Sequence, residues 1–324
     1  MNIGLTYDIQ SDPSDERQVE FDTPETLEAL TAALRDGGHQ VFHLGSPLDL
    51  LARHAKLGGL DLVFNLAEGQ GTRCREAWAP MLLELLELPY AGSDPLALMM
   101  GLDKVLCKQL AMAEGIPTPP WVAMSSLSEL PAALPFKFPA IVKPRYEGSG
   151  RGIDAGAVVS DMAALRSRAA WLTGRCPGPI LIEQFVDGGE LTVCLIGNDP
   201  PMAYPAIQRA IDPASRLSCH VIRPAPESGL TPLQLTTELD RQAGRLSAKM
   251  FQVLGCRDVA RVDFRVDRGG RLQFLEINPL PSFEPAGSFG LLAEYLGTTY
   301  AMLIGSIVQA ALVRERASAT AQMP

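Results

Sequence analysis

Two carboxylates and one amide near the end of the chain carry the clearest chemical signal in the sequence. Gly269-Gly270 is a favourable two-residue loop for a β-hairpin. That loop places Asp263 directly opposite Glu276, and Asn278, two residues further on, shares their face. Opposed carboxylates repel each other, so a cation is expected between them. Carboxylate and amide oxygens are hard ligands that suit Mg²⁺ bridging nucleotide phosphates.

The same pairing defines the two faces of the predicted hairpin. Arg261 lies opposite Asn278 on the polar face, from where its guanidinium can reach phosphates. The other face is apolar, and its pairs are Val262 with Ile277 and Phe264 with Leu275. One alternative stays open: an amphipathic surface hairpin whose acids pair with Arg265 and Arg271.

A glycine-rich segment follows a predicted apolar strand that ends at Lys143. Residues 147–152 read Glu-Gly-Ser-Gly-Arg-Gly, and their backbone N–H groups have few steric limits, as a phosphate cradle needs. The segment fits neither the Walker A pattern nor the dinucleotide fingerprint. A flexible hairpin loop is the alternative. Lys143 and the acidic hairpin downstream favour the phosphate-binding interpretation.

A third segment has the character of a nucleoside site. An apolar strand ends near Glu183 and leads into a bend at Gly188-Gly189. The backbone of Gln184–Val186 can face an adenine edge, with Phe185 packed on the purine and Glu190 accepting from ribose hydroxyls. An ordinary connecting loop is the alternative interpretation.

Residues 1–95 alternate strands and helices, which is typical of a small parallel sheet with helices on its faces. The expected strands are Asn2–Tyr7, Val41–Leu44 and Asp61–Leu66. Helices are expected to begin at Thr23-Pro24 and Ser46-Pro47, because a hydroxyl cap followed by proline starts a helix. The first of them ends at Gly37-Gly38.

The rest of the chain begins helical and then changes character. Helical patterns cover about 74–87 and a stretch reaching Glu114, and glycine and proline at 115–120 end them. Two helices and the strands 121–124, 140–143, 153–158 and 180–183 then predict a small α+β unit. Further expected elements are strands 190–196, 201–208 and 220–223, helices at about 232–254 and 298–316, and the hairpin 259–278. Residues 317–324 are expected to be a disordered tail.

The composition excludes several classes of function. The 324 residues carry a formal charge of −9, which argues against a broad electrostatic grip on nucleic acid or an anionic membrane. No signal peptide and no apolar run approaching the ~18 residues of a membrane span is recognisable. The six cysteines are scattered without metal-ligand spacing, as expected for a cytoplasmic protein in a reducing environment.

Several strings, in this order and spacing, resemble the ATP-grasp superfamily and, more narrowly, the D-alanine–D-alanine ligase family. They are Tyr90-Ala91-Gly92-Ser93, Leu102-Asp103-Lys104 with Lys108, Val142-Lys143-Pro144 with Glu147-Gly148-Ser149, Leu181-Ile182-Glu183 with Glu190-Leu191-Thr192-Val193, Arg261-Val262-Asp263, and Leu275-Glu276-Ile277-Asn278 with Pro281. The resemblance covers about residues 60–310 well and the first 60 loosely.

The resemblance implies an ATP-grasp fold, of α/β and α+β class, with an N-terminal Rossmann-like parallel α/β domain that precedes the ATP-grasp part. The expected units are an N-terminal domain at 1–95, a central small subdomain at 96–186, a C-terminal subdomain with the metal site at 187–316, and a tail at 317–324. It also implies a homodimer.

The resemblance further implies a role for each matching residue. Lys104 and Lys143 would contact ATP phosphates, and Arg261 would stabilise a tetrahedral intermediate. The remaining matches are Glu183, Gln184, Phe185, Val186 and Glu190 for adenine and ribose, Glu147, Gly148 and Ser149 for the loop that closes over the phosphates, and Asp263, Glu276 and Asn278 for two Mg²⁺, with Mn²⁺ as an alternative ion.

Three departures from the family pattern affect the substrate. Glu16 is a plausible holder of a substrate ammonium, although its surroundings differ and an exposed acidic loop is the alternative. The stretch 208–219 lacks the Lys-Tyr pair of the family's lid, and either Arg209 or Arg216 could supply the missing charge. The oxyanion and carboxylate site is partly matched, with Ser282 and Ser288 as candidates.

The expected activity is that of an ATP-dependent carboxylate–amine ligase. A carboxylate would attack the γ-phosphate of ATP to give an acyl phosphate, and an amine would then displace phosphate. Amino-acid or peptide-like substrates are expected. A true D-alanine–D-alanine ligase of cell-wall synthesis is one alternative, and a non-catalytic ATP-binding protein is another.

Overall fold

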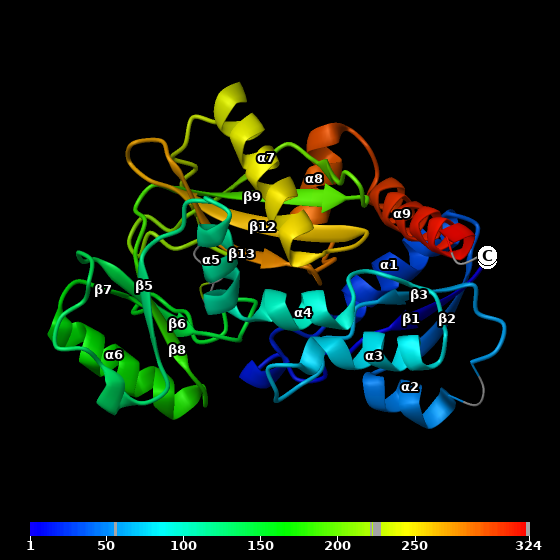
Figure 1. Cartoon of the computed structure of the whole chain (residues 1–324), viewed down its shortest axis with the longest axis horizontal. Coiled ribbons are helices and arrows are strands. Elements are labelled where there is room, and N and C mark those ends of the chain that lie inside the picture. Colours follow the sequence, from blue (N-terminus) through cyan, green and yellow to red (C-terminus); the bar gives the residue numbers. More distant parts are fainter. Residues whose placement is uncertain (55–56, 221, 223–227, 322–324) are drawn as a thin grey trace.

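Three β-sheets with helices packed around them make up the computed structural model, which describes residues 1–54, 57–220, 222 and 228–321 (Figure 1). The parallel sheet near the N-terminus lies at one end of the molecule and the small central sheet at the other. The large C-terminal sheet lies between them and above, in the view of Figure 1.

The N-terminal sheet is parallel, with strand order β2-β1-β3-β4, which confirms the predicted parallel α/β domain. Its strands are β1 (Asn2–Thr6), β2 (Gln40–Gly45), β3 (Leu62–Asn65) and β4 (Tyr90–Ala91). Its helices are α1 (Pro24–Asp36), α2 (Pro47–Arg53) and α3 (Trp78–Leu85), with short 3-10 turns at Glu16–Gln18 and Arg75–Ala77. The predicted caps are confirmed, since the Thr23 and Ser46 hydroxyls accept from backbone N–H groups of the first turns of α1 and α2.

The central sheet is antiparallel and has the order β5-β8-β6-β7. Its elements are β5 (Trp121–Met124), β6 (Ala140–Pro144), β7 (Val158–Val159), β8 (Ile180–Gln184) and α6 (Met162–Arg175), with a 3-10 turn at Leu127–Glu129. The prediction of a strand over 153–158 is wrong in extent, because only the last of these residues pairs with β6. The residues between β6 and β7 form instead the long glycine-rich loop of the site.

The large sheet is antiparallel and contains the predicted hairpin. Its strands are β9 (Gly189–Ile196), β10 (Met202–Ala203), β11 (Ile207–Arg209), β12 (Val259–Val266) and β13 (Leu272–Asn278). The single strand predicted over 201–208 is two short strands, and helix α7 (Thr237–Leu254) begins later than predicted. The strand predicted over 220–223 lies largely outside the described residues.

The helical stretch before residue 114 is broken at Asp103 into α4 (Pro95–Leu102) and α5 (Lys104–Ala113). The Asp103 side chain caps α5 by accepting from the N–H groups of Val105 and Leu106. This cap puts Lys104 at the first position of α5. Cys107 and Ala111, two buried apolar side chains of α5, belong to the same hydrophobic core as α7 and the large sheet.

The hairpin of β12 and β13 keeps the predicted register only in its first half. Asp263 pairs with Glu276, and Arg261 with Asn278, as predicted. A bulge at Leu275 then shifts the register, so Phe264 faces Phe274 and the predicted pair of Phe264 with Leu275 is wrong. The connection spans 267–271, and the predicted two-residue loop at Gly269-Gly270 is therefore also wrong.

The last helices return to the N-terminal sheet. Helix α8 (Ser288–Leu296) and helix α9 (Tyr300–Ala321) share a core with α1, β1 and β3, and α9 lies beside α1 in Figure 1. Phe283 is central to this core, because its ring lies 5.3 Å from Phe64 and 5.2 Å from Phe289. The predicted tail is wrong for 317–321, which continue α9, and its last three residues lie outside the described part.

A membrane span is not formed by any one described helix, because none is both long and apolar enough. Helix α8 and residues Tyr300–Ser318 of α9 are together long and apolar enough to cross a membrane, but they are bent by 109° relative to each other.

Truncating Phe64 tests the core between the N-terminal sheet and the last helices. Phe64 is almost fully buried against Phe283, so Phe64→Ala should lower the free energy of unfolding by about 3–5 kcal/mol. Equilibrium urea unfolding measures this loss. Met112→Ala, at an exposed position of α5, is the control and should change stability by less than about 0.5 kcal/mol. Equal midpoints for both variants would show that this core does not hold the two parts together.

Candidate functional site

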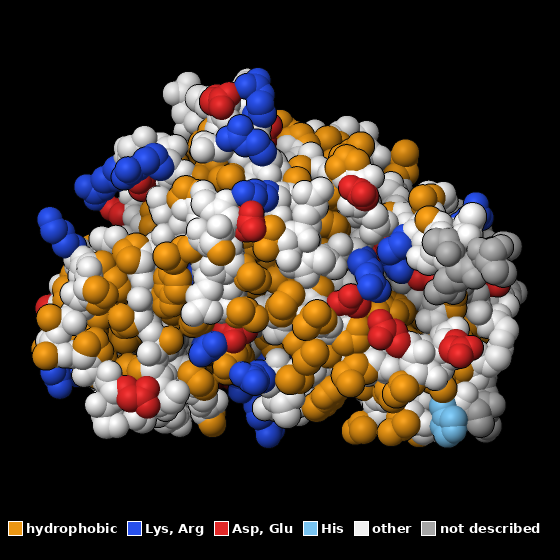
Figure 2. Space-filling model, in the orientation of Figure 1, with side chains coloured by type: hydrophobic (Ala, Val, Ile, Leu, Met, Phe, Trp, Pro, Cys, Tyr) orange, Lys and Arg blue, Asp and Glu red, His pale blue; other side chains and the backbone are white. Residues whose placement is uncertain are grey.

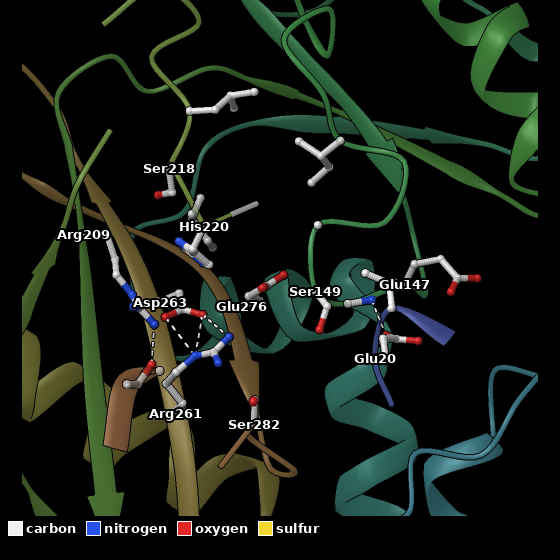
Figure 3. Close-up of a pocket in the computed structure, with 18 of the residues that line it drawn as sticks. Glu20, Glu147, Ser149, Arg209, Ser218, His220, Arg261, Asp263, Glu276 and Ser282 are labelled. Atoms are coloured by element: carbon white, nitrogen blue, oxygen red, sulfur yellow. Dashed lines mark hydrogen bonds and ion pairs between the residues drawn. The ribbon is translucent and has the colours of Figure 1, made fainter. Parts of the chain in front are cut away.

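One cavity of about 470 Å³ lies between the central sheet, the large sheet and the N-terminal residues between 10 and 26. In Figure 3, Arg261, Asp263 and Glu276 project from the large sheet on one side, and Ser149 and Glu20 lie across from them. The sequence-predicted residues that line it are Lys104, Lys143, Glu147, Gly148, Ser149, Glu183, Gln184, Phe185, Val186, Glu190, Arg261, Asp263, Glu276 and Ser282. A smaller pocket of about 50 Å³ opens beside it, and Asn278 lines that pocket.

Asp263 is held in place by three neighbours on the large sheet. Its Oδ1 accepts from Thr192 Oγ1 at 2.7 Å, and its Oδ2 accepts from Arg261 Nη2 at 2.9 Å and from Asn278 Nδ2 at 3.2 Å. Thr192 is the register partner of Asp263 on β9. Arg261 and Asn278 pair with each other two residues further along the hairpin, on the same face of the sheet. The strands therefore fix the orientation of the carboxylate.

Glu276 lies directly across the hairpin from Asp263 and has a different cationic partner. Lys104 Nζ approaches Glu276 Oε2 at 3.1 Å and also donates to the Glu147 carbonyl at 2.7 Å. Burial alone would raise the pKa of Glu276, but the surrounding cations, Lys104 first, lower that pKa to about 2. The carboxylate stays ionised at any physiological pH.

The chemistry of this donor set fits Mg²⁺. Asp263 and Glu276 are opposed carboxylates on one face of the hairpin, Asn278 adds an amide, and all three lie where the two cavities join. The cations beside them, Arg261 and Lys104, are placed to meet phosphate oxygens in the same space.

A buried cluster of two lysines and one carboxylate closes another part of the cavity. Lys143 Nζ lies 2.8 Å from Glu183 Oε1, and Lys108 Nζ lies 2.6 Å from Glu183 Oε2. Burial would raise the pKa of Glu183, but Lys108 and Lys143 outweigh it and keep that pKa below its usual value. Lys108 is four residues after Lys104, so the two share one face of α5. That spacing is a signal from which its role in the site could have been predicted.

The region around Phe185 is an apolar slot edged by charge. The Arg265 guanidinium stacks 4.7 Å from the Phe185 ring, and Arg265 Nη1 lies 3.4 Å from Glu190 Oε2. The bulge in β13 turns Leu275 toward the cavity next to Glu276. Other apolar side chains lining this part are Ile141, Ile153 and Leu217. Such a slot suits a flat base, with Glu190 at its edge for hydroxyl groups.

The glycine-rich loop is docked on the N-terminal domain. Glu20 Oε1 accepts from the backbone N–H of Gly148 at 2.6 Å, and a Cβ at Gly148 would collide with that oxygen. Both oxygens of Glu20 also accept from Arg75 Nη2 at 2.8 Å, and Arg75 Nη1 donates to the Tyr146 carbonyl. Ser149 has a left-handed φ of 48°, which costs conformational energy and turns the loop over the cavity.

Glu16 does not lie in the cavity, so its predicted place in the site is wrong. It lies in the 3-10 turn of residues 16–18 and pairs at 3.0 Å with Arg175, both side chains being more than half exposed. Glu20, four residues later, faces the cavity instead. No local signal distinguishes the two acids, because the contact of Glu20 with Gly148 joins segments 128 residues apart.

Arg209 and Arg216, the two candidates for the missing positive charge, differ in position. Arg209 lines the cavity from β11, is about nine-tenths buried, and donates to the hydroxyls of Thr192 and Ser288. In the described part of the chain, no carboxylate forms an ion pair with Arg209. Arg216 instead pairs with Asp187 at 2.9 Å and does not line the cavity.

His220 is a cavity residue that the sequence analysis did not single out. Burial and the nearby Arg209 and Arg261 lower its pKa to about 3, so its imidazole is neutral. A neutral ring beside two guanidiniums adds a polar group without further charge.

Comparisons with known proteins agree with this geometry. A family model described as the D-alanine–D-alanine ligase C-terminus matches residues 110–309. A D-alanine–D-alanine ligase of Synechococcus sp. (strain JA-3-3Ab) is 31% identical, across 96% of this chain and 94% of that protein. One of Aquifex aeolicus is 28% identical, across 91% and 96%. An uncharacterised protein of Sinorhizobium fredii is 30% identical, across 88% and 86%.

The fold has solved counterparts. The crystal structure of a D-alanine–D-alanine ligase from Bacillus anthracis, complexed with ATP, has a TM-score of 0.74 and 22% identity. The match covers 98% of this chain and 99% of that one. This likeness confirms the predicted ATP-grasp fold.

The charge on Glu276 gives a pH-dependent prediction. Its pKa of about 2 in the folded chain lies below the ordinary 4.5, so ionised Glu276 stabilises the fold above roughly pH 4.5. That contribution is lost as the pH falls from there toward 2. The melting temperature of the wild type should exceed that of Glu276→Gln at pH 6, and the gap should narrow down to pH 3. A gap for Glu276→Gln that stays constant from pH 6 to pH 3 would refute the Lys104 pairing.

Proposed function

The chain belongs to the D-alanine–D-alanine ligase family and is an ATP-dependent C–N ligase of that type, and we propose that it joins amino-acid or peptide-like substrates through an acyl phosphate. The observation that carries the proposal is the pairing of acids and cations in one cavity. Lys104 and Arg261 each hold a carboxylate of the opposed pair Glu276 and Asp263. A metal with a triphosphate would satisfy all four charges at once.

The proposed reaction has two steps. A substrate carboxylate attacks the γ-phosphorus of ATP, which gives the acyl phosphate and ADP. An amine then attacks the acyl carbon, the C–N bond forms, phosphate leaves, and the amine gives up a proton. Lys104, Lys143 and Arg261 neutralise charge that develops on the transferred group, and positioning supplies most of the rate.

Asp263, Glu276 and Asn278 would hold the Mg²⁺ ions, two being expected, with Mn²⁺ as a substitute. Bound there, Mg²⁺ would neutralise the phosphate oxygens of ATP. The apolar slot at Phe185 and Leu275, with Glu190 at its edge, would take the adenosine part. Closure of the loop at Ser149 would exclude water from the acyl phosphate. The Ser282 backbone N–H would face the acyl oxygen, beside Arg261.

Arg209 is proposed to bind an anionic group of the amine substrate. Its buried guanidinium has only hydroxyl partners in the described chain, and an unpaired buried charge is costly. Ser288, its partner, lies at the start of α8 beside the cavity. A carboxylate on the amine substrate would supply the missing negative charge and be held by both residues.

D-alanine itself is a second candidate for both substrates. The proteins named D-alanine–D-alanine ligase match nearly the whole of this chain and not one subdomain alone. Two differences from the family favour amino acids other than D-alanine. Glu16 lies outside the cavity, and Arg209 is proposed to take the place of the family's Lys-Tyr pair.

A homodimer in the cytoplasm is proposed on two observations. Exposed apolar side chains form a patch over α2, α3 and α4, on the face that Figure 2 shows. They include Leu48, Leu51, Met81, Leu85 and Leu96. The six cysteines are all free, which suits a reducing compartment.

Removing one carboxylate of the opposed pair tests the proposed chemistry. The wild type, given ATP, Mg²⁺ and pairs of D- or L-amino acids, should release ADP and phosphate with at least one pair. Asp263→Asn should lower that rate by roughly 100-fold or more, because loss of even the partners of metal ligands costs about 10–100-fold. Circular dichroism checks that the variant is folded. No phosphate release by the wild type with any pair would contradict the proposal, and full activity of Asp263→Asn would contradict the metal site.

The two arginines of the lid region make a matched pair of variants. Arg209→Met should lower kcat/KM for the amine substrate by about 10–100-fold, the value of one charge-assisted hydrogen bond, and Arg209→Lys should lower it less. Arg216→Met, at a partly exposed side chain paired with Asp187, should leave kcat/KM unchanged. Steady-state kinetics with the amine varied at saturating ATP give both values. A larger loss in Arg216→Met would reverse the assignment.

A further inference from the structure

One buried cation in the nucleoside part of the cavity has no role in the chemistry proposed above. Arg265 lines the cavity from β12, and its side chain is only 5% exposed. It faces Phe185 and Glu190, which are proposed to hold the adenosine part of ATP. A buried guanidinium is costly unless its charge is used, so its place beside these two residues indicates a role in nucleotide binding.

Three contacts fix the position of the Arg265 guanidinium. Nη2 donates to the Arg216 carbonyl at 2.9 Å, and Nη1 donates to Glu190 Oε2 at 3.4 Å. The guanidinium carbon lies 4.7 Å from the centroid of the Phe185 ring. The partners belong to three segments, which are the stretch 208–219, strand β9 and the residues just after β8. A planar group held on two edges and one face keeps a single orientation.

The β-ladder makes Arg265 and Glu190 neighbours. The two are register partners on β12 and β9, and on its other side Glu190 is the register partner of Arg209 on β11. Directly opposed side chains of adjacent strands share a face and lie close enough to interact. Among the described cations, only Arg265 forms an ion pair with Glu190, since Arg209 donates to Thr192 and Ser288.

Glu190 depends on this cation to remain a hydrogen-bond acceptor. Burial raises the pKa of its carboxyl group, and Arg265 is the first of the groups that lower that pKa, ahead of Arg209. Asp263, on the same face of the sheet, raises it. An ionised carboxylate accepts hydrogen bonds from two hydroxyl groups at once, whereas a protonated one must use one oxygen as a donor. Arg265 therefore favours the form of Glu190 that suits the two hydroxyls of a ribose.

We propose that Arg265 is a positioning residue that holds the Glu190 carboxylate in place for the ribose hydroxyls and so makes the site select ribonucleotides over deoxyribonucleotides. The proposal rests on the nucleotide site of the proposed function and adds the residue that gives this site its selectivity for the sugar. Arg265 acts through Glu190 and its contact with Phe185 keeps it beside the base. The hydroxyl that is recognised is the 2′ or the 3′, and analogues that lack one or the other distinguish them.

Calorimetric titration with ADP and Mg²⁺ tests the proposal without turnover. ADP has no γ-phosphate to transfer, so its binding is measured apart from any ligase activity. ADP is compared with 2′-deoxy-ADP and 3′-deoxy-ADP, and the readout is the ratio of the Kd of each deoxy analogue to the Kd of ADP. A substitution that merely loosens the fold weakens the binding of all three nucleotides and leaves these ratios unchanged.

The wild type should bind ADP about 10–100-fold more tightly than at least one deoxy analogue, which is the value of a hydrogen bond to a charged group. Arg265→Met keeps the length of the side chain and removes its charge, so it should lower that ratio by roughly 3–10-fold. Arg265→Lys should restore part of the ratio. Arg271→Met, on the same hairpin but exposed and paired with Asp267, should behave as wild type.

A double variant shows whether Arg265 acts through Glu190. Glu190→Gln should lower the ratio at least as far as Arg265→Met does. Adding Arg265→Met to Glu190→Gln should leave the ratio where Glu190→Gln alone puts it, because the effects of two residues that act through one contact do not add. The double variant also removes both charges of the pair, so neither is left buried without its partner.

Three outcomes would overturn the assignment. Equal ratios in the wild type and Arg265→Met remove Arg265 from recognition of the sugar, even if every nucleotide binds more weakly. A ratio in the double variant clearly below that of Glu190→Gln shows that Arg265 acts on the sugar directly. A wild type that binds ADP and both deoxy analogues equally tightly does not recognise the ribose hydroxyls, although it still binds the nucleotide that a ligase uses. Absence of ADP binding contradicts the nucleotide site of the proposed function itself, which is a separate result.

Discussion

The repulsion between two carboxylates that the β-ladder forces to face each other is the constraint on which the site depends. Asp263 and Glu276 are register partners, so the ladder holds both side chains next to each other on the same face of the hairpin. Each is neutralised by a different cation, Arg261 on one strand and Lys104 from α5. In the protein alone, Arg261 and Lys104 neutralise the two carboxylates. The same two cations can neutralise the phosphates of a bound triphosphate, so ATP binding can exchange the carboxylate pairs for phosphate pairs.

A similar exchange is available at Glu183, where Lys143 and Lys108 share one buried carboxylate. Together these ion pairs neutralise the buried charges of the site. The sheets and α5 fix the positions of the paired side chains. The cost of desolvating the charges is met by the packing of three cores around the cavity. The site is therefore preorganised, which is what electrostatic catalysis requires.

The hairpin pairing, the helix caps and the glycine loop could be predicted because they depend on residues near each other in sequence. The pairing of Asp263 with Glu276 was predicted from a two-residue turn that the structure does not have. It is correct because the bulge at Leu275 offsets the longer connection over 267–271. The same reasoning failed at Leu275, because a bulge has no strong local signature and shifts every later pair. Glu20 could not be predicted, since its place depends on how the N-terminal domain docks against a loop 128 residues away.

The exchange of ion pairs is tested most directly by a crystal structure of the protein with Mg²⁺ and a non-hydrolysable ATP analogue. The account predicts metal density bounded by Asp263, Glu276 and Asn278, with Lys104 moved from Glu276 to a phosphate oxygen. Nucleotide bound away from this hairpin, or bound while Lys104 and Arg261 keep their carboxylate partners and no metal lies between the acids, would contradict it.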